Sequence, residues 1–158
     1  MRSLDAPLRL WGLVLAGNLL AGALFALFLS WFGPAKGIIS EVALTHIAAK
    51  YIDMSFITVL SSALLAGWMM GLLGWLMSSV QDSISRIVLI ILVTVIIGYA
   101  ELHHCVVGSL EVIAAMLVDE HIGLTDYWHF LWPSVLGNLI GGALFVSVLK
   151  FGVSQRRS

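Results

Sequence analysis

Long apolar stretches separated by short polar segments dominate the pattern along this chain. The stretches cover about residues 10–32, 56–78, 84–118 and 128–151. One α-helical crossing of a bilayer needs roughly 20 predominantly apolar residues. The pattern therefore predicts an all-α integral membrane protein, with residues 1–158 forming a single transmembrane domain of four spans.

The third stretch, residues 84–118, is too long for one straight helix, because it has about 35 residues. It also contains four ionisable residues, Glu101, His103, His104 and Glu111. Ionisable groups at membrane depth are costly and usually face a cavity or a pathway. We therefore expect a helix broken near residues 99–104, with its second half starting near His104. Discontinuous helices of this kind commonly mark the substrate site of a transporter.

A more polar segment, residues 35–53, separates the first two spans. Its apolar residues alternate with Lys36, Glu41, His46 and Lys50. This segment is too polar to span, and the pattern is typical of an amphipathic helix lying at the membrane interface. We place that helix at about residues 38–50.

Composition supports a membrane location. Hydrophobic residues make up 60% of the 158 residues, charged residues 11%, and the mean hydropathy is +1.03. Soluble domains are about 45–50% apolar and about 25% charged. The net charge of −1 gives no indication of a nucleic-acid partner. The single cysteine, Cys105, excludes an internal disulfide and a cysteine metal cage.

Basic residues fix the expected orientation. With four spans, the two termini and the loop at Asp82 lie on the same side of the membrane. That side holds Arg2, Arg9, Arg86, Lys150, Arg156 and Arg157, and the other side holds only Lys36 and Lys50. Because cytoplasmic loops carry an excess of Lys and Arg, both termini are predicted to be cytoplasmic.

The first and last spans share a motif. Residues 17–25 read Gly-Asn-Leu-Leu-Ala-Gly-Ala-Leu-Phe, and residues 137–145 read Gly-Asn-Leu-Ile-Gly-Gly-Ala-Leu-Phe, so seven of nine positions are identical. Three crossings separate the copies, which therefore point in opposite directions, as in an inverted-topology repeat. If each repeat holds three spans, this chain has four spans of a six-span fold, and a second broken helix belongs to the absent part.

Three segments resemble the formate/nitrite transporter family. Residues 66–76 resemble its fourth-helix pattern Ala-Asn-Trp-Leu-Val, residues 102–109 its fifth-helix pattern Phe-Glu-His-Ser-x-Ala-Asn-Met, and residues 137–143 its sixth-helix pattern Gly-Asn-x-x-Gly-Gly. The match covers nearly the whole chain, as helices three to six. Three positions depart from the family pattern: His103 stands where the family has Glu, and Gly67 and Gly108 stand where it has Asn.

The resemblance implies an aquaporin-like inverted-repeat bundle with a broken pore helix, assembled as a pentamer in the bacterial inner membrane. It implies passive or proton-coupled transport of small monovalent weak-acid anions, such as formate, nitrite or hydrosulfide, without a cofactor. His104 takes the place of the central pore histidine, and Leu102 that of a constriction aromatic.

The site residues admit more than one role. A histidine with a pKa near neutrality can hold or supply a proton at the pore midpoint, so His104 is the first candidate, with Ser109 and Cys105 as minor lining. Alternatively, His104 hydrogen-bonds a backbone group freed by the break. His103 lines the pore, caps the break or faces a neighbouring helix, and Glu101 pairs with a histidine.

The remaining candidates concern the pathway and helix packing. Glu111, two helical turns after His104, lies along the pore or bridges to Trp or Ser groups. Asn18 and Asn138 are expected to form interhelical hydrogen bonds beside the breaks, with Gly67 and Gly108 allowing close packing.

Other function classes fit less well. Adjacent histidines do not easily ligate one metal ion from a regular helix, and the sequence has no His-Glu-x-x-His motif. We therefore expect no enzyme and no resident metal. Two alternatives stay open: a transporter of a different small solute, and a non-transporting remnant or half-protein that needs the missing helices.

Overall fold

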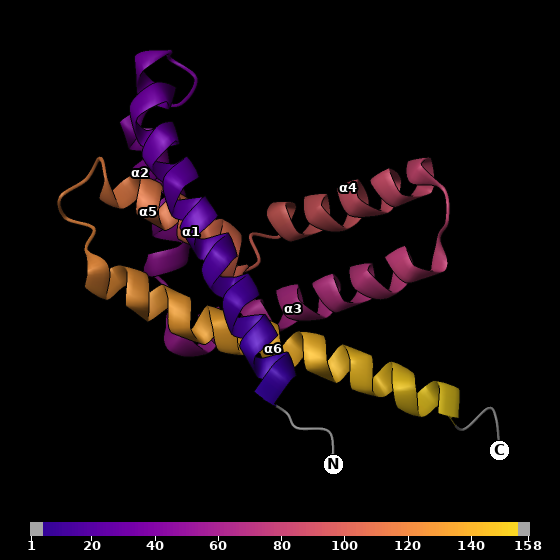
Figure 1. Ribbon diagram of the computed structural model, residues 1–158. Coiled ribbons are helices and arrows are strands. Elements are labelled where there is room, and N and C mark those ends of the chain that lie inside the picture. The colour runs from indigo at the N-terminus through magenta and orange to yellow at the C-terminus, as the bar shows by residue number, and fades with distance from the viewer. Residues whose placement is uncertain (1–4, 155–158) are drawn as a thin grey trace. The chain divides into compact units, whose positions relative to one another are not determined.

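The computed structural model describes residues 5–154, with side chains described for that range except residues 7 and 147–154. This part of the chain contains helices and no strand, which confirms the all-α prediction. The helices, drawn in Figure 1, are α1 Asp5–Ala35, α2 Glu41–Ile52, α3 Phe56–Ser79, α4 Ser83–Tyr99, α5 Cys105–Met116 and α6 Leu124–Ser154.

The chain divides into two compact units, each built from two segments. Unit 1 comprises the residues up to Asp53 together with Val106–Trp128, and unit 2 comprises Met54–Cys105 together with the residues from His129 onward. Unit 1 thus holds α1, α2 and nearly all of α5, and unit 2 holds α3, α4 and most of α6.

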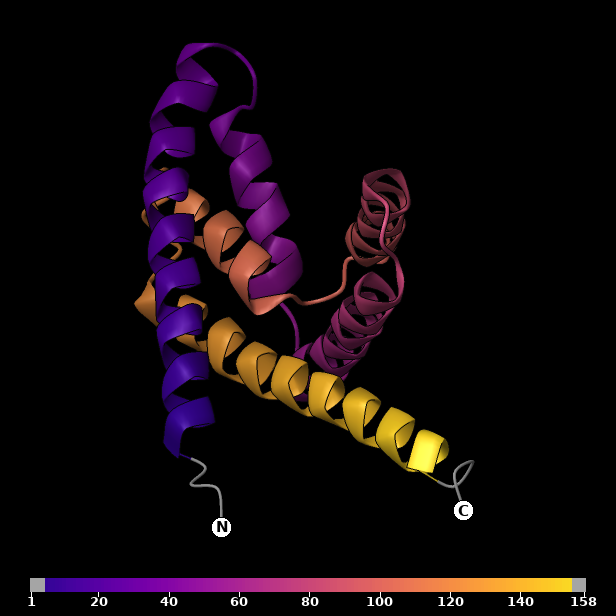
Figure 2. The ribbon, with the colours of Figure 1, turned by 45° about the vertical axis from the view of Figure 1, so that its right-hand side comes forward.

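In unit 1, α1 and α2 form a helical hairpin (Figure 2). Gly37 lies in the turn with φ +65°, a left-handed conformation that suits glycine, and the Ile38 N–H donates to the Gly33 carbonyl at 2.9 Å. Ser40 caps α2 by accepting from the Ala43 N–H at 3.1 Å. The core of this unit contains Ala26, Leu44 and Ala114, with Leu29, Ile39, Leu110, Ile113 and Val118 packed around them.

In unit 2, α3 and α4 lie side by side as a second hairpin (Figures 1 and 2). Asp82 caps α4 by accepting from the Ser85 N–H at 2.8 Å. This hydrogen bond is the largest cause of a lowered pKa of Asp82, and a hydrogen bond from the Ser85 hydroxyl is the second. The core of the hairpin contains Leu73, Val93 and Ile97, and Met69, Met77, Leu89 and Leu102 pack against it.

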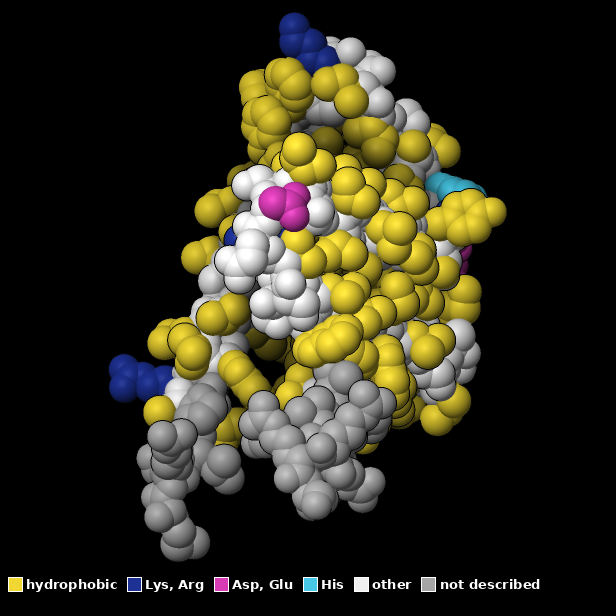
Figure 3. Space-filling model, turned by 90° about the vertical axis from the view of Figure 1, so that its right-hand side faces the viewer, with side chains coloured by type: hydrophobic (Ala, Val, Ile, Leu, Met, Phe, Trp, Pro, Cys, Tyr) yellow, Lys and Arg dark blue, Asp and Glu magenta, His cyan; other side chains and the backbone are white. Residues whose placement is uncertain are grey.

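Three of the described helices contain segments long and apolar enough to cross a bilayer: Leu8–Ala35, Phe56–Ser79 and Leu124–Val146. The two shorter apolar helices, α4 and α5, have 17 and 12 residues, and each is below the roughly 20 that one crossing requires. Hydrophobic side chains cover most of the face drawn in Figure 3, where charged side chains are few and scattered. These features are those of a membrane protein.

The remaining sequence expectations about topology stay predictions. Residues 99–104, the range suggested for a break, contain the junction between α4 and α5. The segment assigned to an interfacial helix contains α2. Arg2, Arg156 and Arg157, on which the predicted orientation depends, lie outside the described residues.

Candidate functional site

The junction between α4 and α5 is a short non-helical segment, residues 100–104. The helical pattern of hydrogen bonds ends with the Leu102 N–H donating to the Ile97 carbonyl at 3.0 Å. Glu101 is exposed and has φ +50°, a left-handed conformation that costs an L-residue about 1–2 kcal/mol. The surrounding contacts must therefore hold this segment in place.

Asn138, from α6, binds the main chain of this junction on both sides. Its Oδ1 accepts from the Cys105 N–H at 2.9 Å, and its Nδ2 donates to the His103 carbonyl at 2.9 Å. Nδ2 also donates to the Ala63 carbonyl of α3 at 2.8 Å. One amide thus ties α3, α6 and the start of α5 together and satisfies backbone groups that the break leaves without helical partners.

Small residues bring α6 close enough to α3 for this contact. A Cβ added at Gly137 would lie 2.6 Å from the Ala63 Cβ, and one added at Gly67 would lie 2.7 Å from the Asn138 Cα. At Gly141 an added Cβ would collide with the Leu64 carbonyl. These glycines allow the two backbones to touch, as in closely packed membrane helices.

His103 is fixed within unit 2. Its side chain is buried, and its Nδ1 lies 2.9 Å from the Ser62 Oγ, while its main-chain N–H donates to the same oxygen at 3.0 Å. Its ring also lies 6.2 Å from the ring of Phe130, centroid to centroid. Of the roles considered for His103, this arrangement favours packing against neighbouring helices.

His104 is the last residue before α5 and is half-buried. Its Nδ1 is buried and has no hydrogen-bond partner among the described residues. The Cys105 N–H and the His103 carbonyl, which flank it in the chain, are bonded to Asn138 instead. The main-chain groups on either side of His104 therefore do not bond its ring nitrogen Nδ1.

In unit 1, α5 carries two further predicted site residues. Ser109 is fully buried, and its Oγ accepts from the Tyr127 hydroxyl at 3.1 Å. Glu111 is half-buried; Tyr51 hydrogen-bonds its carboxylate and Lys50 lies near it. The other oxygen of that carboxylate, Oε2, is buried without a partner in the described part of the chain. Each residue is thus held by a tyrosine hydroxyl.

Comparison with known proteins identifies the family. The family model for formate/nitrite transporters matches residues 2–152 of this chain. The chain belongs to the formate/nitrite transporter family. This confirms the resemblance drawn from the three sequence motifs and identifies the protein as a member of a transporter family.

Three relatives are identical to this chain at about a third of the aligned positions or fewer. Inner membrane protein YfdC of Escherichia coli is 27% identical over 95% of this chain and 47% of its own length, and the uncharacterized transporter YrhG of Bacillus subtilis is 32% identical over 89% and 53%. Formate channel BtFdhC of Bacillus thuringiensis is 31% identical over 70% and 42%. The chain spans about half the length of the curated relatives it matches.

The other positions singled out within the family motifs lie in both units. Leu102 is half-buried and packs against the core of the α3–α4 hairpin. Gly108 is buried. The predicted pairing of Glu101 with a histidine stays a prediction. Asn18 is exposed, and its Nδ2 donates to the Val14 carbonyl of its own helix at 2.8 Å.

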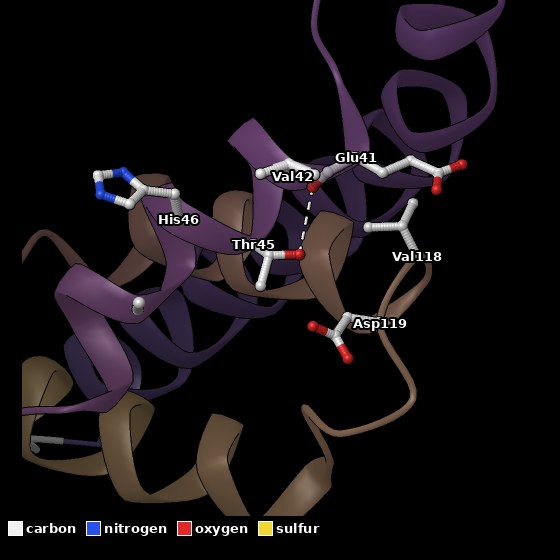
Figure 4. Close-up of a pocket in the computed structure, with 7 residues that line it drawn as sticks. Glu41, Val42, Thr45, His46, Val118 and Asp119 are labelled. Atoms are coloured by element: carbon white, nitrogen blue, oxygen red, sulfur yellow. Dashed lines mark hydrogen bonds between the residues drawn. The ribbon is translucent and has the colours of Figure 1, made fainter.

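An open groove of about 470 Å³ lies in unit 1, between α2 and the end of α5, and contains none of the predicted site residues. Its lining residues are Glu41, Val42, Thr45, His46, Ala49, Val118 and Asp119. Figure 4 shows the Thr45 hydroxyl turned back to the Glu41 carbonyl of its own helix, at 3.2 Å. The lining combines two acidic residues, Glu41 and Asp119, with His46 and apolar residues, and it does not reproduce any of the three family motifs.

The residues that hold the site from outside the motifs were not predicted from the sequence. Ser62, Tyr127 and Tyr51 each bond a residue far away in the chain, and Ser62 and His103 are 41 positions apart. The polar Ser61-Ser62 pair within an apolar span was a signal that one hydroxyl has a partner. The two tyrosines gave no comparable signal.

Proposed function

We propose that this protein contributes to a membrane pathway for small monovalent weak-acid anions of the formate or nitrite type. The pathway is passive or proton-coupled and lies in the bacterial inner membrane, with both protein termini in the cytoplasm. The family match supports this function, and so does the relative from Bacillus thuringiensis that is named a formate channel. The assembly is proposed to be the pentamer implied by the family resemblance.

The observation that carries the proposal is the position of His104. It directly precedes the first residue of α5, and its buried Nδ1 has no partner among the described residues. Moving a bare anion through an apolar barrier is expensive, whereas the neutral acid passes far more easily. A histidine at this point can hold or supply the required proton, and N–H groups at the start of α5 favour an anion nearby.

The other residues have supporting roles in this proposal. Leu102 narrows the pathway, and Ser109 and Glu111 lie along it. His103 and Asn138 hold the break in shape through their contacts with Ser62, Ala63 and the main chain. Glu101 tethers the segment by pairing with a histidine.

Flux into proteoliposomes tests the function. We expect purified protein to take up isotopically labelled formate or nitrite faster at acidic pH, and His104→Ala to lower that uptake by about tenfold, or ~1.4 kcal/mol of barrier. His121→Ala, in the exposed loop before α6, is the matched control and should leave uptake unchanged. Uptake by His104→Ala with the rate and pH dependence of the unmodified protein would contradict the role of His104.

A second candidate is a half-transporter that acts only together with further helices. The coverage of about half of each relative favours it. Native mass spectrometry in nanodiscs separates the two candidates, because a discrete pentamer with flux supports a self-sufficient channel. A monomer without flux supports the half-transporter.

A further inference from the structure

In unit 1, the helix α5 carries one acidic residue, Glu111, and no basic residue. Its neighbours Val112, Ala114 and Ala115 are fully buried, and α5 packs against α2 through a core that contains Leu44 and Ala114. A charged group among apolar side chains is unfavourable unless it is paired and hydrogen-bonded. The partners of the Glu111 carboxyl group therefore decide which of its protonation states fits this position.

The two oxygens of Glu111 have different surroundings. Oε2 is buried and has no hydrogen-bond partner among the residues that the structure describes. The Tyr51 hydroxyl, which bonds the carboxyl group, therefore donates to the other oxygen, and the charge of Lys50 lies near. An ionised carboxylate can accept about four hydrogen bonds, so the enclosed Oε2 lacks the donors that a carboxylate oxygen favours.

The neutral acid fits the same geometry. A proton on Oε2 removes the negative charge at the enclosed oxygen, and it leaves the other oxygen free to accept from the Tyr51 hydroxyl. Lys50 acts in the opposite direction, because a nearby positive charge favours the carboxylate. The carboxyl group can thus gain or lose a proton without breaking its hydrogen bond to Tyr51.

The electrostatic partners of Glu111 in the described part of the chain both come from α2: Lys50 and Tyr51. The helix α1 has no ionisable side chain between residues 10 and 35. The other titratable groups of the packed elements are engaged elsewhere. Asp126 accepts from the Gly123 N–H, Tyr127 donates to Ser109, and Glu41, His46 and Asp119 line the groove between α2 and the end of α5.

We propose that Glu111 is a proton-binding site of this protein, with the proton on Oε2 and with Tyr51 and Lys50 setting the pH at which the proton is taken up. When a proton arrives from water, the carboxylate becomes a carboxyl group and this three-residue cluster gains one positive charge. The site lies in unit 1 and does not include His104, which belongs to unit 2. The inference deepens the proposed function, on which it rests for its role, by naming a residue that holds a proton in a proton-coupled pathway.

Infrared difference spectroscopy of the purified chain in nanodiscs, between alkaline and acidic pH, tests the assignment. We expect a carbonyl stretch at the frequency of a protonated carboxyl group with few hydrogen bonds, and Glu111→Gln should remove it. Glu120→Gln, in the exposed loop that follows α5, is the matched control and should retain it. A spectrum without this band at any pH, or a band that Glu111→Gln leaves intact, would overturn the proposal.

Two further variants keep Glu111 and test its partners, so the assignment does not depend on Glu111→Gln folding. Tyr51→Phe removes the hydroxyl donor and Lys50→Gln removes the positive charge, and both groups favour the carboxylate. Each variant should let the protonated band persist to higher pH, by about one pH unit, which is a tenfold change in proton affinity. Midpoints that neither variant moves would contradict the assigned partners.

Matched controls for these two variants are available at exposed positions. Tyr99→Phe, at the end of α4, and Lys36→Gln, in the turn after α1, should leave the midpoint of the band unchanged. The spectra require no transport, so they separate this assignment from the proposed function. Bands that behave as expected in a protein without anion flux would contradict the proposed function alone, and flux in a protein without the Glu111 band would contradict the assignment of Glu111 alone.

Discussion

The motif Gly-Asn-Leu occurs in α1 and in α6, and the two helices use it differently. In α6 the glycine touches α3 and the asparagine binds three main-chain groups. In α1 the glycine has no described neighbour, and the asparagine bonds its own helix. Identical local sequence therefore does not determine the environment of a membrane helix, because close packing also requires a partner with small residues and free main-chain groups.

The largest effect is expected at the glycine that the two copies share. Gly137→Ala places a Cβ 2.6 Å from the Leu60 carbonyl oxygen, so α6 must move away from α3, and overpacking of this kind costs about 1–3 kcal/mol. Gly17→Ala meets no described atom and should stabilise the helix by up to ~1 kcal/mol through helix propensity. Unfolding in mixed micelles, followed by circular dichroism, measures both changes.

The two substitutions are expected to change the free energy of unfolding in opposite directions, so measuring both tests the comparison directly. Equal destabilisation by both would mean that the α1 copy is packed as tightly as the α6 copy. Gly74→Ala serves as the control within α3, because an added Cβ there also meets no described atom.

The all-helical class was accessible from the sequence because it depends on the length and spacing of apolar stretches. Three of the four ionisable residues of the third stretch, Glu101, His103 and His104, lie between α4 and α5. The contacts that hold the site were not accessible. Whether Asn138 or Asn18 reaches a break depends on which helices lie beside each one, and the sequence motif is the same in both places.

A similar limit applies to the two adjacent histidines. Both lie in the motif that resembles the family's fifth helix, and only the fold distinguishes them: Nδ1 of His103 lies 2.9 Å from the Ser62 Oγ, whereas Nδ1 of His104 has no described hydrogen-bond partner. Residue type identified the candidates, and the tertiary contacts of their Nδ1 atoms differ.

A smaller effect is expected from the serine that supports the break beside the α6 copy. Ser62→Ala removes the oxygen bonded to the N–H and to the Nδ1 of His103, and the net contribution of a typical hydrogen bond of this kind is about 0.5–1.5 kcal/mol. We expect lower thermal stability and faster hydrogen exchange at the His103 amide. Ser61→Ala, at an exposed neighbouring position, is the control, and equal effects of the two substitutions would show that the bonds to His103 contribute nothing specific.

The smallest effect is expected at Asp82, which lies in neither copy and provides a baseline for both. Its folded pKa is lowered by hydrogen bonds from Ser85. The carboxylate therefore stabilises α4 fully above its ordinary pKa of about 3.9, and that stabilisation is lost as the pH falls below this value and through the lowered folded pKa. Asp82→Asn keeps a good N-cap without a charge, so exchange of the α4 first-turn amides should lose this pH dependence. An unchanged pH profile in Asp82→Asn would assign the dependence to another group.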